Sequence, residues 1–301
     1  MTELSKITKK QQAILKLLYR FRFLNRIQIQ AFLGHKDPKT INMWLRDLRA
    51  KGYVEWIYST HFAEKTKPAI YYLNLNGARY LRTLTMERED EDSGEIIVSP
   101  SYPPEELRKR YKEPTRSQTF IDRCILIANC ALALEQDNDT NRTGGKNLRY
   151  YYETEADYLL DYSYYHFVAE SETISPHFIF CKVLIDKDGK IEKTLESYIY
   201  EVFDPTLPQY RMKKRLGDYV KFLDEEVDEW QDETSTDRLP VILLVCPRTT
   251  DLIYAKRWTR GRIAAAWEWD DDDRERPRMQ FTTMSSLQKH GLLGSYIWEQ
   301  A

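Results

Sequence analysis

The sequence has no long hydrophobic run. No stretch reaches the roughly 18 consecutive apolar residues of a membrane-spanning helix, so we expect no membrane partner. The first ten residues, MTELSKITKK, place no apolar core after a basic start, which argues against a signal peptide. Coiled-coil heptads and internal repeats are also missing. We therefore expect a globular cytoplasmic protein.

Cysteine is scarce and scattered. The four cysteines are Cys124, Cys130, Cys181 and Cys246, and no two of them form a CxxC pair. Disulfide frameworks and zinc sites need clustered or regularly spaced cysteines, so this pattern indicates neither. We expect reduced, buried thiols and no bound metal or other cofactor.

What the chain does have is an uneven distribution of charge. The net charge is −2, but residues 1–85 hold sixteen Lys and Arg against five Asp and Glu, an excess of eleven positive charges. The rest of the chain has an excess of thirteen negative charges. A cationic module attracts a polyanion, which makes nucleic acid the candidate partner. With 301 residues, the chain is long enough for two domains.

The basic segment, residues 1–85, has the pattern of a winged helix-turn-helix. Thr8 and Gln11 form a capping box before a first helix, a second helix covers about Asn25 to Phe32, and Asp37-Pro38 starts a third. The buried stripes are predicted to hold three sets of side chains: Ile14, Leu17, Leu18 and Phe21; Ile27 and Phe32; Ile41, Leu45 and Leu48.

Two β-rich runs follow these helices. Val54, Trp56 and Tyr58 alternate with polar or exposed positions, and Ala69 to Leu73 forms the second run. The polar segment Ser59 to Pro68 between them is long enough for a wing. Three helices, a hairpin and a closing helix from Asn76 complete the predicted domain.

The third helix is the element expected to enter the major groove of DNA. Its outward face would combine cations for phosphates with groups that bond base edges, and Met43 could touch a thymine methyl. The wing and the first two helices would add backbone contacts. The predicted DNA-binding residues are Lys39, Thr40, Asn42, Met43, Arg46, Arg49, His61, Lys65, Lys67, Lys9, Lys10 and Arg26.

Residues 86–115 are expected to form an acidic, proline-containing linker, either flexible or folded back on the basic domain as a competitor for DNA. Residues 116–301 then alternate helix and strand patterns. Pro240 to Cys246 is fully apolar, as in strands buried on both faces. The chain is therefore predicted to be an α/β (α+β) protein whose second domain has a central mixed sheet flanked by helices. In that domain, Arg211 to Arg215 (RMKKR) is either a phosphate contact or a solvated helix face.

The chain resembles the replication-relaxation family of bacterial plasmids and mobile elements. The resemblance rests on the order of three segments, YYLNLNGARYL (Tyr71 to Leu81), YIYEVFDPTLPQYRMKKRLGDYVKFL (Tyr198 to Leu223) and PVILLVC. It implies an N-terminal winged helix and a C-terminal domain similar to the PD-(D/E)XK nucleases.

A metal-dependent nuclease of that kind needs two carboxylates and a lysine. Here His177 follows Pro176 where the first acid is expected, and Phe203 stands where the lysine is expected; only Glu201 matches. Asp204 and Lys213 could substitute, with Mg²⁺ or Mn²⁺ as the metal. We expect a domain without catalytic activity.

These observations predict a sequence-specific double-stranded DNA-binding accessory or regulatory protein of a plasmid or mobile element. Its role could be replication, relaxation or transcription control, with replication or conjugation proteins, or a second copy of the chain, as further partners. Two alternatives remain at this stage: a metal-dependent endonuclease or nickase that uses Glu201, Asp204 and Lys213, and an adaptor that binds an acidic protein.

Overall fold

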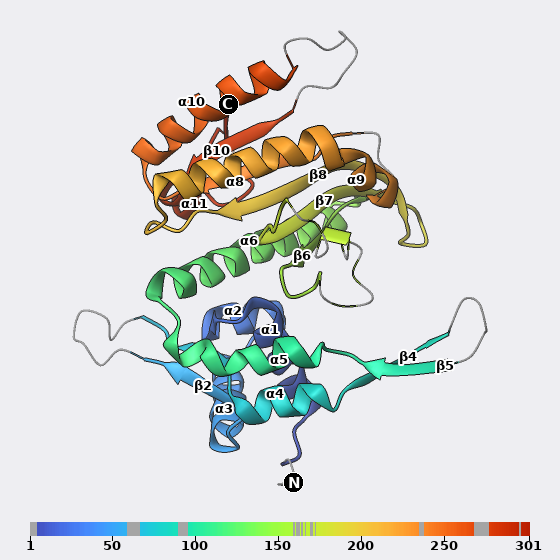
Figure 1. The fold of residues 1–301 in the computed structure, drawn as a ribbon. Helices are drawn as coiled ribbons and strands as arrows, with labels where there is room; N and C mark the ends of the chain where they lie inside the picture. The colour runs from blue at the N-terminus through green and yellow to red at the C-terminus, as the bar shows by residue number, and fades with distance from the viewer. Residues whose placement is uncertain are drawn as a thin grey trace. The chain divides into compact units, whose positions relative to one another are not determined.

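The chain forms two structural units. The computed structural model describes residues 5–58, 67–89, 96–158, 160, 163, 165, 167–168, 171, 173–234, 238–267, 277–294 and 296–301. Residues 1–128 make up unit 1 and residues 129–301 make up unit 2 (Figure 1).

Unit 1 begins with a winged helix-turn-helix. Its elements are α1 (Lys9–Phe21), β1 (Leu24–Asn25), α2 (Arg26–Phe32), α3 (Pro38–Ala50), β2 (Val54–Ile57), β3 (Ile70–Leu73) and α4 (Leu75–Arg82). The three strands form an antiparallel sheet in the order β1-β3-β2. The element order agrees with the sequence-based prediction.

Local capping sets where the helices of this unit begin. Thr8 and Gln11 form the predicted capping box of α1, and Asn25 and Gln28 form a second one at α2. The α2 box turns Gln28 and Ile29 inward, where the Gln28 side chain donates to the carbonyl of Ile125 at 2.9 Å. The prediction that Ile27 faces the core is therefore wrong, because Ile27 is 56% exposed.

The core of the winged helix is formed largely by the predicted apolar stripes of α1 and α3. Ile14 and Leu18 of α1 and Ile41, Leu45 and Leu48 of α3 are all at most 1% exposed. One position of the α1 stripe differs from the prediction, since Leu15 is buried and Leu17 only half-buried. Burial of this kind contributes roughly 1.5–3 kcal/mol for each large aliphatic side chain.

The segment expected to be a linker differs from that expectation. Residues 86–115 contain the rest of β4 (Thr85–Glu89), then β5 (Ile96–Pro100), α5 (Pro104–Lys109) and the 3₁₀ helix η2 (Arg110–Thr115), while residues 90–95 lie outside the described part. Tyr102 and Leu107 are buried in unit 1. The Glu113 carboxylate accepts from Arg22 at 2.9 Å and from Arg110 at 3.3 Å. These contacts supply the apolar and ionic stabilisation that the composition alone did not indicate.

Unit 2 is built on a six-stranded mixed sheet. The helix α6 (Gln118–Thr143) runs across the division between the units and precedes the sheet. The strands are β6 (Leu148–Thr154), β7 (Phe178–Ile185), β8 (Ile191–Val202), β9 (Val241–Cys246), β10 (Met279–Thr283) and β11 (Glu299–Gln300), in the order β11-β10-β9-β8-β7-β6. The pairs β8-β9 and β9-β10 are parallel, and the other neighbours are antiparallel.

The helices of unit 2 flank this sheet as predicted. They are α8 (Gln209–Lys221), the π-helical turn η3 (Phe222–Glu226), α9 (Val227–Thr234), α10 (Thr249–Trp267) and α11 (Met284–His290). One core cluster joins Leu216 of α8 and Leu252 of α10 to Ile242 and Leu244 of β9. The apolar strand β9 is buried at every residue, as its sequence indicated.

The four cysteines, all within the described residues, are buried, and none of them forms a disulfide. Burial raises the pKa of Cys130 and of Cys246 to about 12, because a thiolate would lose its hydration there. Both thiols are therefore protonated at neutral pH.

No single helix in the described ranges combines the length and apolar content of a membrane span. The segments 104–115 and 118–143 meet that test only when joined, and they are bent by 119° at their junction.

Glu113→Ala should destabilise unit 1 by about 3–5 kcal/mol, because the buried Arg110 guanidinium would lose its carboxylate. Urea unfolding followed by circular dichroism measures this change. The control is Glu106→Ala, which breaks a pair with the exposed Lys109 and should cost about 0–1 kcal/mol. Equal effects of the two substitutions would contradict the structural role of Glu113.

Candidate nucleic-acid interface

The N-terminus of α3 is fixed by an aspartate cap. The Asp37 carboxylate accepts from the backbone N–H of Lys39 at 2.9 Å and of Thr40 at 3.0 Å, and from the Thr40 hydroxyl at 2.6 Å. The hydrogen bonds from the Thr40 hydroxyl and the Lys39 amide hold the pKa of Asp37 below its usual value. Thr40, expected at the DNA surface, thus has its hydroxyl engaged with the cap.

A second carboxylate joins α3 to α1. Asp47 accepts from the Gln11 side chain at 2.6 Å and from the Lys51 ammonium at 2.7 Å. The hydrogen bond from Lys51, followed by that from Gln11, lowers the pKa of Asp47. This clamp and the apolar stripe together set the rotation of α3 about its axis, and so determine which side chains point outward.

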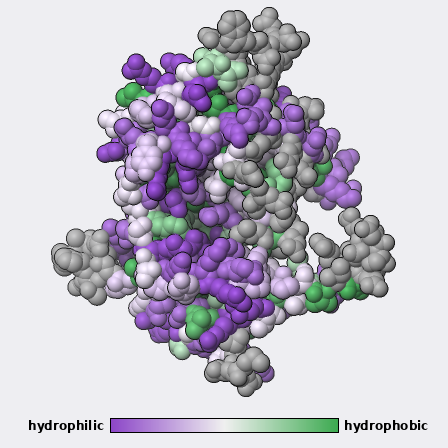
Figure 2. Space-filling model, in the orientation of Figure 1, coloured by the Kyte–Doolittle hydropathy of each residue, from purple (hydrophilic) through white to green (hydrophobic). Residues whose placement is uncertain are grey.

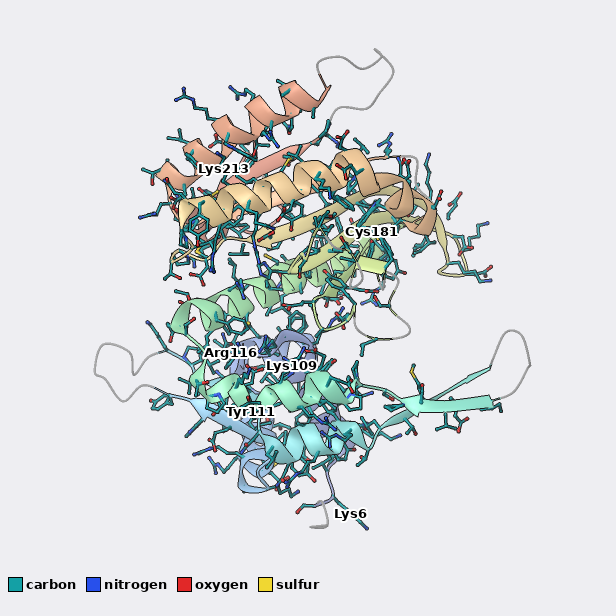
Figure 3. All side chains as sticks on the ribbon, viewed as in Figure 1. Lys6, Lys109, Tyr111, Arg116, Cys181 and Lys213 are labelled. Atoms are coloured by element: carbon teal, nitrogen blue, oxygen red, sulfur yellow. The ribbon has the colours of Figure 1, made fainter. Side chains whose placement is uncertain are left out.

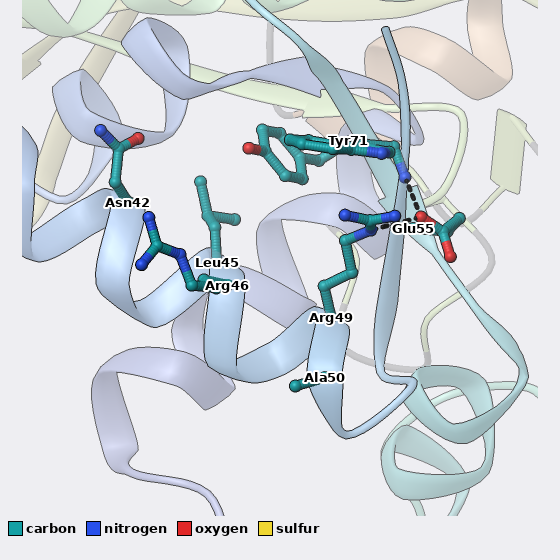
Figure 4. Close-up of a pocket in the computed structure, with 8 residues that line it drawn as sticks. Asn42, Leu45, Arg46, Arg49, Ala50, Glu55 and Tyr71 are labelled. Carbon is teal, nitrogen blue, oxygen red and sulfur yellow. Dashed lines mark hydrogen bonds and ion pairs between the residues drawn. The ribbon is translucent and has the colours of Figure 1, made fainter.

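The outward face of α3 holds the predicted base-reading set. Lys39, Asn42, Met43, Arg46 and Arg49 are all exposed. Figure 4 shows Asn42, Arg46 and Arg49 along one side of the helix, with Tyr71 of β3 across from them. The amide and guanidinium groups can make paired hydrogen bonds to adenine and guanine edges.

Arg49 is already engaged within the protein. Its Nε donates to the Glu55 carboxylate at 2.7 Å, and its guanidinium lies 4.1 Å from the ring centre of Trp56. Both contacts come from β2, so the C-terminal end of α3 is coupled to the hairpin.

A groove of about 690 Å³ separates α3 from the hairpin. It is lined by Asn42, Leu45, Arg46, Arg49, Ala50, Glu55, Trp56 and Tyr71. Burial raises the pKa of the Tyr71 hydroxyl, so that it stays a neutral donor. The groove thus combines donors, cations and an aromatic wall beside the helix expected to read DNA.

Trp56 and Tyr58 are functional candidates that the sequence reading missed. They were expected to alternate inward with Val54, but they are 38% and 46% exposed, and their rings stack with centroids 5.8 Å apart. Of these three residues only Val54 is buried, whereas Trp56 lines the groove and lies against the Arg49 guanidinium. The following residue, Ile57, is the one that packs against a core cluster, so the strict alternation expected from the sequence does not hold here.

The remaining predicted DNA-binding residues differ in their exposure. Lys9, Lys10 and Lys67 are exposed. Arg26 is half-buried and donates to the Gln30 side chain at 3.1 Å, so it is partly committed within α2. His61 and Lys65 of the predicted wing lie outside the described residues. Hydrophilic side chains cover much of the visible face of unit 1 (Figure 2).

The candidate catalytic glutamate of unit 2 has a cation as its neighbour. Glu201, on β8, is 1% exposed, and its carboxylate is hydrogen-bonded to the Arg215 guanidinium of α8. Burial, then the adjacent Glu201 charge, raises the pKa of the Tyr219 hydroxyl. The guanidinium is therefore a counter-ion for the glutamate that the family resemblance suggested as a metal ligand.

The other candidate catalytic residues have separate roles. His177 lies against the C-terminal end of β8, where its Nδ1 accepts from the Val202 amide at 3.3 Å. Asp204 caps the following turn by accepting from the Thr206 amide at 2.8 Å. Lys213 is exposed on α8 (Figure 3), with its Nζ 6.0 Å from the ring centre of Trp258.

These residues do not fit a divalent metal. A Mg²⁺ or Mn²⁺ site needs several unpaired oxygen ligands at one place. Glu201 is bonded to Arg215, and Asp204 is bonded within its own turn. Among the residues that the structure describes, no group of three His, Cys, Asp or Glu side chains could hold a metal ion.

Fold and site define a winged helix-turn-helix protein with a second, mixed-sheet unit. The family model for replication-relaxation matches residues 15–151 of this chain. The resemblance to that family, first drawn from sequence segments, is confirmed over these residues, which include most of the winged helix.

Comparison with solved structures gives one further likeness. The matched structure is the crystal structure of the Vibrio cholerae ferric uptake regulator (Fur), which reveals a structural rearrangement of that protein's DNA-binding domains. The match covers 38% of this chain and 82% of the Fur chain, at 16% sequence identity and a TM-score of 0.20. The comparison with curated proteins found no match. The fold assignment of unit 1 therefore depends on its own elements and strand order.

Acid should destabilise unit 1 through Asp37 and Asp47. In the folded protein both pKa values lie below the usual aspartate value of 3.8, so the stabilisation by the two carboxylates is complete well above that pH and is lost as the pH falls through the folded-state values. Between about pH 5 and pH 2, which spans the usual pKa of a carboxylic acid, the urea concentration at the unfolding midpoint should fall as the pH falls. The fall should be less steep for the double variant Asp37→Asn, Asp47→Asn than for the wild type.

Glu105→Gln, which removes an exposed acid on α5, provides the matched control and should keep the wild-type steepness. An identical pH profile for all three proteins would show that neither aspartate is linked to folding.

Proposed function

We propose that this chain is a sequence-specific double-stranded DNA-binding protein of a plasmid or mobile element, with an accessory or regulatory role. The observation that carries the proposal is the exposed row Lys39, Asn42, Met43, Arg46 and Arg49 on α3. An α-helix fits the major groove, where each base pair presents a distinct set of donors and acceptors. The match to the replication-relaxation family supports a replication-related role.

The charge of the segment supports the choice of a polyanion as partner. Residues 1–85 carry an excess of eleven positive charges, while the whole chain has a net charge of −2. Contacts from Lys and Arg to phosphates release counterions, so affinity should fall steeply as salt rises. An adaptor for an acidic protein would share this salt dependence, but it would not need the amide of Asn42 beside Arg46.

We propose that unit 2 has no nuclease activity. The support is the bond between Glu201 and Arg215, which places an internal cation on the one acid that matches the expected motif. Without Glu201, Asp204 is the one acid of the candidate set left to bind a metal. Its carboxylate already accepts a hydrogen bond from the Thr206 hydroxyl. A nuclease would have to break both arrangements before it could bind a metal.

Arg46→Ala should weaken binding to the preferred duplex by about 5-fold to 150-fold and relax its base preference at one position, because a guanidinium bonded to a base edge contributes about 1–3 kcal/mol. The preferred duplex is selected from a random library, and affinity is measured by fluorescence anisotropy.

Two further variants separate the kinds of contact. Lys9→Ala with Lys10→Ala should weaken all duplexes alike and lower the salt slope, as expected for phosphate contacts. Arg108→Ala, an exposed cation on α5, should change neither affinity nor preference. Binding that is indifferent to Arg46, or an absence of duplex binding by the wild type, would refute the proposal.

Supercoiled plasmid incubated with the protein and Mg²⁺ or Mn²⁺ should stay intact, because Arg215 occupies the carboxylate of Glu201. Agarose gels resolve nicked from supercoiled DNA. Metal-dependent nicking that disappears in Glu201→Ala would replace this proposal with the endonuclease alternative.

A further inference from the structure

Unit 2 is acidic, but two of its helices are strongly basic. Residues 129–301 contain 22 Lys and Arg against 32 Asp and Glu. Within them, α8 and α10 together hold nine Lys and Arg against two acids, Asp218 and Asp251. The rest of unit 2 therefore has an excess of seventeen negative charges. Such segregation concentrates a positive potential over two neighbouring helices and repels a polyanion elsewhere on the unit.

The two basic helices lie side by side on one face of the sheet (Figure 1). A depression of about 480 Å³ opens over α10, lined by Tyr254, Arg257, Trp258, Gly261 and Arg262. Its walls are mostly aromatic and aliphatic surface, and its rim is cationic. None of the candidate nuclease residues Glu201, Asp204 and Lys213 lines the depression itself.

Trp258 forms the centre of this site. Lys213 of α8 and Arg262 of α10 place their cationic groups 6.0 Å and 5.7 Å from its ring centre. The tip of the indole lies against α8 at Gly217, where an added Cβ would make an ordinary van der Waals contact at 3.4 Å. The indole is partly buried, and two cationic groups lie over its ring.

The cations at this site lack acidic partners within the described residues. Lys213, Arg257 and Arg262 form no ion pair there, whereas cations elsewhere on the same two helices pair with acids, as Lys214 does with Asp218 and Lys256 with Glu299. Lys213 and Arg262 lie over the Trp258 ring and Arg257 lines the same depression, so the three cations leave a positive charge that an anionic ligand would neutralise.

We propose that the surface formed by Lys213, Tyr254, Arg257, Trp258 and Arg262 binds single-stranded nucleic acid. Bases would stack on Trp258 and Tyr254, and the three cations would contact the flanking phosphates. Proteins that bind single strands combine these two elements, an aromatic platform and a cationic track. This site is separate from α3, and it goes beyond the proposed reading of duplex DNA.

The aromatic floor decides between single strands and the other polyanions. In a duplex the base faces are covered by their neighbours, so a duplex would use the cations and leave Trp258 without a role. An acidic peptide would likewise need only the cations. A single strand uses both, since each of its bases offers a planar face.

The test uses the full-length protein and a fluorescein-labelled dT20 in an anisotropy titration. Trp258→Ala should weaken binding about tenfold, the loss expected from one unstacked base. Arg257→Gln with Arg262→Gln, both exposed and remote from the core, should lower the slope of log K against log salt by about 1.4, since each phosphate contact on a single strand contributes roughly 0.7.

Arg260→Gln is the matched control, because Arg260 is exposed on the same helix but does not line the depression. It should leave affinity and slope unchanged. Arg46→Ala should also leave dT20 binding unchanged, so this proposal and the duplex proposal can fail independently.

Three results would overturn the proposal. They are no binding of dT20 by the wild type, equal losses for the Arg257 and Arg262 pair and for the Arg260 control, and competition by duplex DNA or polyglutamate at least as strong as that by unlabelled dT20. The arginine variants keep the test decisive if Trp258→Ala fails to fold.

Discussion

The burial of one apolar stripe on α3 constrains most of what unit 1 presents to its surroundings. Ile41, Leu45 and Leu48 face the core, and the Asp47 clamp to Gln11 holds the helix at that rotation. Because an α-helix turns by about 100° per residue, fixing three inward positions also fixes the outward ones. The row of polar and cationic side chains that we propose to read DNA therefore follows from the packing of the opposite face.

The parts of unit 1 that sequence reasoning predicted are those fixed by local interactions. The Thr8 box, the Asp37 cap and the stripe of α3 each depend on residues within one or two helical turns, and all are found. The exposure of Trp56 depends instead on the groove between β2 and α3, where the indole meets Arg49, and no local pattern records that contact. Likewise, the structure of residues 96–115 includes a pair between Glu113 and Arg22, a residue 91 positions away.

Unit 2 shows the same division between local and distant information. The sequence has His177 and Phe203 at the two positions where the nuclease motif implied by the resemblance would have an acid and a lysine. It could not show that Arg215, fourteen residues after Glu201, returns to bond that carboxylate. A buried carboxylate must be paired, because an uncompensated charge in the interior is costly. Arg215 meets this need from within the chain.

The engagement of Arg49 by Glu55 and Trp56 has a consequence for how selective the protein is toward DNA. In the proposed complex, an Arg49 side chain that turns toward a phosphate or base gives up its Nε bond to Glu55, so its net contribution is the difference between the two interactions. A poorly placed phosphate offers less than Glu55 does, and the arginine then stays where it is. Non-cognate sequences would lose one attraction that the cognate site retains, without any group that repels them. Glu55 would thus act as an internal competitor that sets a threshold for engagement.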